Sequence, residues 1–383
     1  MKVLEIDRSA LPFNAKALAS ARTLRGLSQV ELAGRVGLSR QQIYNLEHGE
    51  VKSPPASTVR ALAAALQMPV DYFARQMGPP RDPKMLHRRG KRRITAKTTE
   101  QLCSLADHFD IVVQHVMRLA TFERVNFPAL PVQSLVEVER VAEACREYWG
   151  LGQGPLVSVT RVLERAGAFV GRYAVEADGV DAFSWLRPRP AVLCNTSKDS
   201  PSRGRFSLGH ECGHLVLHQG ETTGDPISEG QANRFAGAFL IPQHSFFRDF
   251  PRGSGDRLNW DGMRRMKRDW GMSVAAILHR ALDLRLIGED TYRWSQIRLA
   301  QLGWKKREPD EPHEWEPPEL LTNVLRSLAE RGRPPGFSLT LLEETTGAGL
   351  TPTTVSRDNV RVLRPEEVEA MANKFLADLG DES

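Results

Sequence analysis

The sequence predicts an α+β protein that is mostly helical and is divided into several domains. Its 383 residues exceed the length of one ordinary domain. Hydrophobic residues make up 41% of the chain and charged residues 26%, as in folded globular proteins. Helical patterns fill most of the chain, whereas β-rich segments occur only in its middle. We therefore expect an N-terminal domain of five helices, a second domain with a small β-sheet among helices, and a small C-terminal module.

Changes in composition indicate where the domains begin and end. Arginine and lysine crowd residues 75–97, where Asp82 is the only acidic residue, and prolines interrupt residues 305–318. The net charge of +5 permits nucleic-acid binding without requiring it. The expected order is an N-terminal domain over residues 14–76, a basic linker or arm over 77–97, a second domain with a helical lead-in over 98–304, a linker over 305–318 and an unassigned module over 319–383.

The N-terminal domain carries signals for the starts and ends of its first helices. Apolar residues from Leu18 to Leu27 recur at helical spacing and predict a first helix. Ser28 followed by Glu31 is typical of a capping box at the start of a second helix. Gly37 is expected to end that helix, because glycine readily adopts the left-handed conformation found there.

Three further helices complete this predicted domain. Ser39 is expected to cap a third helix, which Gly49 closes. Ser57 is expected to open a fourth helix, and a short fifth helix begins at residues 70–73.

The second domain combines helical and β patterns. Residues 98–150 contain two long helical patterns, and helices are expected again from about Arg205 and over residues 257–300. Between them lie short segments rich in valine and aromatic residues, separated by glycine or proline, which predict strands: AGAFVGRYAV, VDAFSWL and PAVLCN.

A His-Glu-x-x-His motif points to a metal site in one of these helices. His210 and His214 are four residues apart, so a helix places both imidazoles on one face, where they can bind a single Zn²⁺. Glu211 lies next to the first ligand and can serve as the general base toward a water at the metal. Cys212 lies two residues from each histidine and is expected to point away from the ion.

A catalytic zinc needs a third protein ligand, and the sequence offers three candidates. His218 continues the histidine face, but it lies eight residues from His210, about 12 Å along a helix, so one ion cannot reach both ends. Glu221 falls in a polar loop. Glu229 begins a second amphipathic helix that can fold back beside the first, so we expect Glu229 to be the ligand. Asn233 lies one turn after Glu229. Asn233 and His218 are expected to support the ligand side chains without binding the metal themselves.

The segment HECGHLVLH followed by EGQANRFAGAFLIP resembles the ImmA/IrrE family of metallopeptidases, which includes phage anti-repressors and radiation-response regulators. The family pattern is HExxH followed by ExxANxFAxxxLxP, and the resemblance covers roughly residues 150–285. It implies a zincin-like fold and a zinc-dependent endopeptidase that cleaves a repressor protein in a stress, phage or mobile-element response. The family's metal ligands correspond to His210, His214 and Glu229, with one zinc per chain, and its base corresponds to Glu211. The cysteine inside the motif departs from the larger residue usual in the family.

Residues 14–75 resemble the phage-repressor helix-turn-helix family, the XRE or Cro/C1 type. The matching sequence is LRGLSQVELAGRVGLSRQQIYNLEHGEVKSPPASTVRALAAALQMPVDYF. The resemblance implies binding to a double-stranded DNA operator as a homodimer, because such domains read half-sites in pairs. The residues expected to reach base edges are Arg40, Gln41, Gln42, Tyr44 and Asn45, whereas Gln29 and Ser39 are expected to meet phosphate.

Some alternatives stay open at this point. The peptidase-like domain could sense a ligand or a metal without catalysis, and the helix-turn-helix could serve protein contacts instead of DNA. Residues 266–288 look superficially like another helix-turn-helix, but their position favours packing over the zinc helices. Scattered cysteines, and the lack of any apolar run approaching the roughly 18 residues of a membrane span, favour a cytoplasmic protein with no membrane partner.

Overall fold

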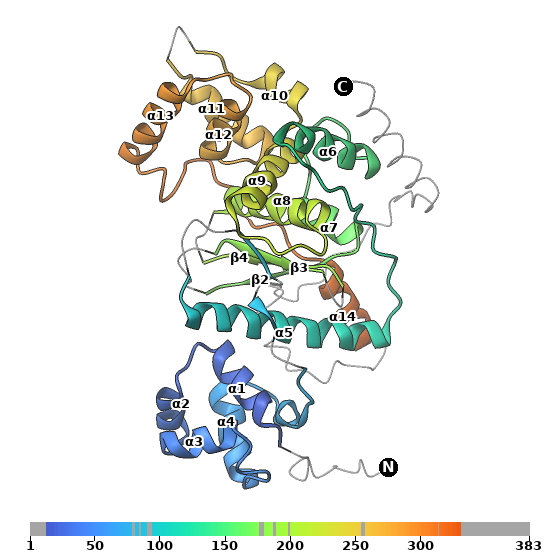
Figure 1. The fold of residues 1–383 in the computed structure, drawn as a ribbon, viewed down its shortest axis with the longest axis vertical. Coiled ribbons are helices and arrows are strands. Elements are labelled where there is room, and N and C mark those ends of the chain that lie inside the picture. The colour runs from blue at the N-terminus through green and yellow to red at the C-terminus, as the bar shows by residue number, and fades with distance from the viewer. Residues whose placement is uncertain are drawn as a thin grey trace. The chain divides into compact units, whose positions relative to one another are not determined.

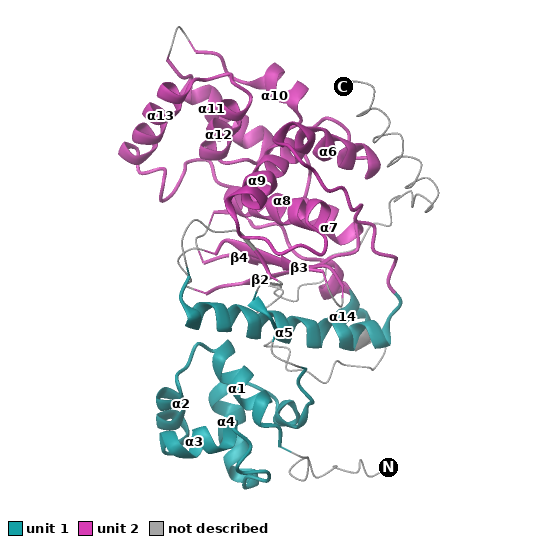
Figure 2. Cartoon of the chain, viewed as in Figure 1, with its two compact units in different colours: residues 1–85, 93–121, 324–345 teal, residues 86–92, 122–323, 346–383 magenta. Residues whose placement is uncertain are grey.

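The computed structural model describes residues 13–330 except for 79–80, 84–85, 90–93, 176–179, 187–188, 198–199, 254–256 and 313 (Figure 1). Most of the C-terminal module predicted for residues 319–383 therefore lies outside the described residues. Among the residues that are described, no helix is both long enough and apolar enough to cross a membrane. The chain divides into two compact units (Figure 2). The N-terminal unit consists of residues 1–85, 93–121 and 324–345, and the second unit consists of 86–92, 122–323 and 346–383.

The N-terminal unit is all-helical, and the prediction of five short helices is confirmed. Its buried core gathers apolar residues from every one of these helices, including Leu18, Leu32, Ile43, Leu62 and Phe73. The fifth helix is a 3₁₀-helix, which suits so short a segment. The elements are α1 (Ala15–Leu24), α2 (Gln29–Val36), α3 (Arg40–Glu47), α4 (Ala56–Leu66), η2 (Val70–Ala74) and the longer α5 (Ala96–Leu119).

Local capping chemistry sets the ends of α2 and α3. Ser28 accepts a hydrogen bond from the Glu31 backbone while the Glu31 carboxylate accepts one from Ser28, so the predicted capping box is present. Gly37 ends α2 with a φ of 68°, as expected. Ser39 caps α3 and forms a second capping box, which the sequence analysis did not predict. The fourth helix starts earlier than predicted, at Ala56, without a side-chain cap.

Helix α5 belongs to the N-terminal unit, whereas the sequence analysis attached it to the second domain. The Gln101 amide donates to the carbonyl of Leu24 at 3.1 Å, and Ile111 packs against the core of the N-terminal unit. The ring of His108 stacks on Tyr72 with 4.9 Å between centroids. An apolar helix face shows that a helix is buried but not which core buries it, and this explains the error.

The second unit contains a four-stranded sheet in the order β1-β3-β4-β2. Strands β2 and β4 are parallel, whereas β3 pairs antiparallel with both β1 and β4. The three predicted strands are confirmed, but β1 lies inside the stretch predicted to be a basic linker or arm. The strands are β1 (His87–Arg89), β2 (Phe169–Tyr173), β3 (Ala182–Trp185) and β4 (Ala191–Asn195).

Helices pack on this sheet and on one another around the largest core of the second unit (Figure 1). Helix α8 contacts β1, β3 and β4 and also packs closely on α9. In the segment 266–288, side chains such as Met266 and Ile277 are buried in this core, which supports the packing role expected for it. The helices are α6 (Leu135–Tyr148), α7 (Val159–Arg165), α8 (Pro201–Leu217), α9 (Pro226–Leu240), α10 (Gln243–Asp249), α11 (Trp260–Trp270), α12 (Val274–Asp283) and α13 (Glu289–Gln301), and α14 (Leu320–Glu330) follows later in the chain.

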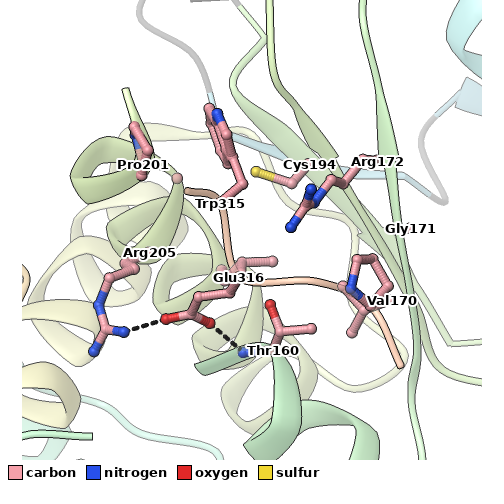
Figure 3. A pocket seen from close by; sticks show the side chains of 12 residues that line it. Thr160, Val170, Gly171, Arg172, Cys194, Pro201, Arg205, Trp315 and Glu316 are labelled. Carbon is pink, nitrogen blue, oxygen red and sulfur yellow. Dashed lines mark hydrogen bonds and ion pairs between the residues drawn. The ribbon is translucent and has the colours of Figure 1, made fainter. Parts of the chain in front are cut away.

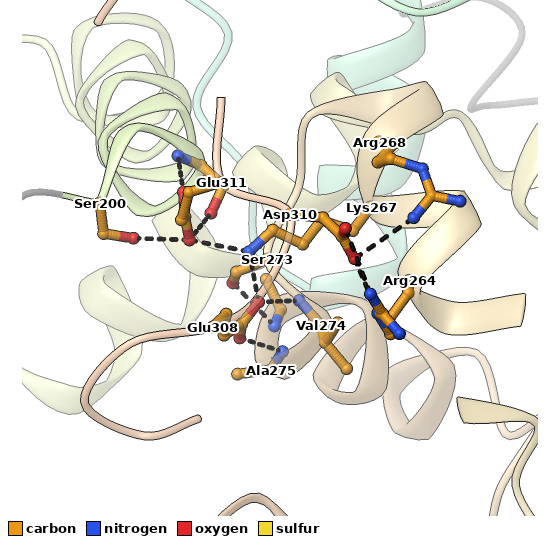
Figure 4. A network of polar contacts seen from close by, with 12 residues as sticks. Ser200, Arg264, Lys267, Arg268, Ser273, Val274, Ala275, Glu308, Asp310 and Glu311 are labelled. Carbon is orange, nitrogen blue, oxygen red and sulfur yellow. Dashed lines mark hydrogen bonds and ion pairs between the residues drawn. The ribbon is translucent and has the colours of Figure 1, made fainter. Parts of the chain in front are cut away.

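Residues 305–318 are anchored to the second unit, although the sequence analysis expected a linker. The Lys267 ammonium is 1% exposed and lies 2.9 Å from Glu308 and 2.7 Å from Glu311 (Figure 4). Glu316 pairs with Arg205 and accepts a hydrogen bond from the Thr160 backbone at 2.8 Å (Figure 3). Buried carboxylates of this segment pair with cations and accept hydrogen bonds from backbone N–H groups, and these contacts hold it in place. Its prolines and charges were therefore misleading evidence for a linker.

Candidate metal centre and nucleic-acid interface

Helix α8 presents the two histidines of the HExxH motif side by side. The Nε2 atoms of His210 and His214 lie 3.0 Å apart, and neither side chain has exposed surface. This arrangement follows from the four-residue spacing, because residues i and i+4 share one face of a helix. The two ring nitrogens therefore converge on one point, as two ligands of a single ion must.

Close packing of α8 on α9 brings the third candidate ligand to this point. A Cβ on Gly213 would lie 3.1 Å from the Cβ of Phe235, and one on Gly209 would lie 3.5 Å from Ala236. The two glycines thus let the helices approach closely. Asp225 caps the start of α9 by accepting hydrogen bonds from two backbone N–H groups, and Glu229 follows in the first turn.

Glu229 completes a set of three donor groups. Its Oε2 lies 3.5 Å from His210 Nε2, and its Oε1 lies 3.4 Å from His214 Nε2. The three ligand atoms lie within 4.8 Å of one another. The Oε1 atom is buried and has no hydrogen-bond partner among the described residues, which is costly unless a cation satisfies it. Two imidazoles and one carboxylate form a donor set that fits Zn²⁺.

The surroundings favour the protonation states that metal binding requires. Burial lowers the pKa of His214 to about 4, so this imidazole is neutral near pH 7. For Glu229, burial raises the pKa, but contacts with His210 and His214 outweigh it and bring the pKa to about 2. A neutral imidazole and an ionised carboxylate are the ligand forms that bind a divalent ion.

Hydrogen bonds on the far side of the rings orient the two imidazoles. His210 Nδ1 lies 3.1 Å from Asn233 Oδ1, so it donates there and leaves Nε2 as the free acceptor. His218 donates from Nε2 to Gln231 Oε1 at 2.8 Å, and its Nδ1 accepts from His214 Nδ1 at 3.0 Å. The Nε2 lone pairs of both candidate ligands consequently point toward Glu229 and each other.

A residue of the β-sheet fixes the side chain of the candidate base Glu211. Its side chain has no exposed surface, and the Ser184 hydroxyl on β3 donates to Glu211 Oε2 at 2.6 Å. The ring of His87 on β1 stacks on His214, with 5.0 Å between centroids and 9° between planes. His87 Nδ1 also lies 2.7 Å from the Thr223 hydroxyl.

Helix α3 exposes most of the side chains expected to contact DNA. Arg40, Gln41 and Tyr44 are exposed, and Tyr44 stacks on His48 with 3.8 Å between centroids. Gln42 is exposed, but its Oε1 accepts the Ser39 N–H at 2.8 Å, so the capping box already uses one of its polar atoms. Asn45 is partly buried and its amide hydrogen-bonds that of Gln41. Arg40, Gln41, Gln42 and Tyr44 thus present side chains to solvent from one helix.

Gln29, the expected phosphate contact, is half-buried in the structure. Its amide donates to the Glu47 carboxylate at 2.7 Å, and Glu47 is also paired with Arg22. This side chain therefore links α2 to α3 within the motif.

Two sequence families match the chain in the places that the geometry indicates. Residues 18–73 match the model of a helix-turn-helix family, and residues 163–282 match the IrrE N-terminal-like domain of a peptidase family. The chain joins an XRE-type helix-turn-helix domain to an ImmA/IrrE-type peptidase domain. None of the curated proteins compared with the chain matches it.

The IrrE N-terminal-like domain contains the whole HExxH motif and Glu229, as the sequence analysis expected. Three polar residues around the metal centre were missed: Gln231, Ser184 and His87. Gln231 lies two residues after Glu229, and such residues do not share one side of a helix, so its contact with His218 could not be predicted from spacing. Ser184 and His87 could not be predicted either, since their contacts depend on how the sheet packs, and His87 lies outside the IrrE N-terminal-like domain.

Proposed function

We propose that this DNA-binding regulator uses its peptidase-like domain as a zinc-dependent endopeptidase that cleaves a repressor protein. One observation carries the proposal. His210, His214 and Glu229 converge from two packed helices, and Glu211 lies one residue from the first of them. Two imidazoles, one carboxylate and an adjacent base are the parts that zinc peptidases need.

The chain's own groups have defined roles in this proposal. Zinc, when bound by His210, His214 and Glu229, supplies a Lewis acid that polarises the scissile carbonyl and acidifies water. Glu211 accepts a proton from the attacking water and then delivers it to the leaving amine. The hydrogen bond from Ser184 fixes the carboxylate of Glu211 for both transfers. Asn233 and His218 keep the two imidazoles in the tautomer that binds metal.

The proposed partners follow from the two domains. The helix-turn-helix domain binds a double-stranded operator in the cytoplasm, and a homodimer reads two half-sites. The substrate is a repressor, cleaved in a stress, phage or mobile-element response. A small helix-turn-helix repressor encoded beside this chain is the first substrate to test.

The first test replaces the proposed base. Glu211→Gln should retain one zinc per chain and bind operator DNA as tightly as the wild type, because it leaves the ligands and α3 intact. Cleavage of the neighbouring repressor should fall by a factor of roughly 10²–10⁴, the usual contribution of a general base. Metal analysis, DNA-binding titration and a gel assay of cleavage measure the three properties. Undiminished cleavage by this variant would end the enzymatic assignment.

A second candidate function is a sensor that binds zinc or a ligand without catalysis. The observation that favours it is the complete burial of the His210, Glu211 and His214 side chains, which leaves only Glu229 of the four groups partly exposed, at 21% of its side chain. In that case the wild type and Glu211→Gln would be equally inactive toward the repressor, and zinc loading would change operator affinity in both.

A further inference from the structure

The outer edge of β3 is occupied by a very short strand. β1 pairs antiparallel with β3, with His87 opposite Ser184 and Arg89 opposite Ala182. The other edge of β3 pairs with β4, so β1 takes the one remaining edge. A sheet edge offers a row of N–H and C=O groups that any extended peptide can pair with. β1 fills that position with only three residues.

This edge lies directly beside the candidate catalytic groups. Ser184, which faces His87 across the strand pair, hydrogen-bonds Glu211. His87 itself is 3% exposed and stacks on the candidate ligand His214. A peptide bond brought to Glu211 along the outer edge of β3 would take the place that β1 now occupies. The burial of all three residues of the HExxH motif is consistent with such a closed site.

We propose that the outer edge of β3 is the docking surface for an extended segment of the protein substrate, and that β1 occupies this surface within the same chain and closes the site. The proposal rests on the peptidase function proposed above. An incoming segment would pair with β3 through its main chain, as peptides do in strand addition, and would place its scissile bond beside Glu211. Displacing β1 breaks the few main-chain hydrogen bonds of a three-residue strand and the contacts of His87 with Thr223 and His214.

The occupying strand comes from outside the IrrE N-terminal-like domain. The residues before it, up to 85, and those after it, from 93, belong to the N-terminal unit. In the sequence, β1 therefore lies between two segments that belong to the N-terminal unit, although β1 itself belongs to the second unit.

A reversible cross-link tests whether β1 blocks the surface. Arg89 and Ala182 are directly opposite in the register, so the double variant Arg89→Cys/Ala182→Cys should form a disulfide that fixes β1 on β3. The four native cysteines are buried and should not interfere. The single variants Arg89→Cys and Ala182→Cys are the controls. A fluorescein-labelled peptidyl hydroxamate, added to the zinc-loaded full chain, reports binding without turnover.

A second variant opens the surface. Arg88→Pro removes a backbone N–H from the middle of β1 and disfavours the strand, and Arg88→Ala is its matched control. The oxidised double variant should bind the hydroxamate at least tenfold more weakly than its reduced form. Arg88→Pro should bind it at least tenfold more tightly than Arg88→Ala. Equal affinities in the oxidised and reduced double variant would overturn the proposal.

Cleavage measured on the same proteins separates this proposal from the proposed function. The cross-link could weaken hydroxamate binding while no form of the protein cleaves the neighbouring repressor or unfolded casein. In that case the proposed docking surface is supported and the proposed peptidase function is wrong. If all forms cleave at equal rates, the peptidase function stands and the role of β1 is wrong. Slow cleavage by the oxidised form, restored on reduction, supports both.

Discussion

At the scale of single residues, the candidate metal centre depends on which ring nitrogen of each histidine carries the proton. His218 is the acceptor that keeps the proton of His214 on Nδ1, and Gln231 in turn fixes His218. The sequence analysis gave His218 a supporting role from distance alone, since a helix carries it too far from His210 to share an ion. The chain of hydrogen bonds supplies the physical reason for that role.

Replacing His218 should therefore weaken metal binding without removing a ligand. His218→Phe keeps the ring volume but leaves His214 Nδ1 without its acceptor. We expect zinc affinity to fall by roughly 10–100-fold, the usual effect of losing such a partner. Competition with a chromophoric chelator measures the dissociation constant, and His244→Phe on the exposed face of α10 is the control. An unchanged constant in His218→Phe would show that the tautomer of His214 is set in another way.

His108 in α5 predicts how the stability of the N-terminal unit depends on pH. Burial lowers the pKa of His108 from 6.5 to about 4, so the folded unit binds fewer protons than the unfolded chain between these values. Stability must then decrease as the pH falls from 6.5 toward 4. The loss attributable to this group is about 2 kcal/mol at pH 5.

The variant His108→Phe should remove this pH dependence, since phenylalanine has no proton to bind and can keep the contact with Tyr72. Hydrogen exchange of α5 amides at pH 5 and pH 7.5 measures the local free energy of opening in both proteins. The wild type should lose more stability than the variant on acidification. Parallel losses in the two proteins would mean that His108 is not buried in its neutral form.

At the scale of elements, the site exists because α8 and α9 pack closely. Gly213 is the contact where this packing is tightest, since a Cβ there would meet Phe235 at 3.1 Å. Gly213→Val should push the helices apart, destabilise the second unit by roughly 1–3 kcal/mol and move Glu229 away from the histidines. Urea unfolding and zinc titration measure the two effects.

Gly230 supplies a matched control for this prediction. It lies on α9 next to Glu229, and a Cβ there would have nothing within 4 Å. Gly230→Ala should leave zinc affinity unchanged and stabilise the helix by roughly 0.5–1 kcal/mol. If Gly213→Val binds zinc as well as Gly230→Ala does, the close approach of the helices is not what positions Glu229.

The elements also show where sequence patterns carry enough information. Capping residues such as Ser28 and Gly37 act on their own helix, so their effects could be predicted from neighbours in the chain. The same holds for His210 and His214, whose convergence follows from helical spacing. β1 reads His-Arg-Arg, which has no strand signal, and its pairing arises only from the free edge of β3. The sequence of α5 likewise could not show which unit provides the core that buries its apolar face.

At the scale of the whole molecule, the chain joins a DNA-binding domain to a peptidase-like domain, and both could be predicted from local motifs. The segments between and after them could not, because their composition resembles that of linkers. Residues 305–318 are charged and rich in proline, yet Glu308 and Glu311 hold the buried ammonium of Lys267. Such long-range ion pairs become visible only when distant parts of the fold are brought together.

The convergence of three ligands is the feature on which the rest of the molecule's proposed chemistry depends, and zinc titration of Glu229→Ala tests it most directly. Glu221→Ala is the matched control, because Glu221 is the exposed carboxylate that the sequence offered as a rival ligand. The wild type and Glu221→Ala should each bind one zinc per chain with the same affinity. Glu229→Ala should bind zinc at least about 100-fold more weakly, since it loses a direct ligand. Wild-type affinity in Glu229→Ala would contradict the metal centre described here.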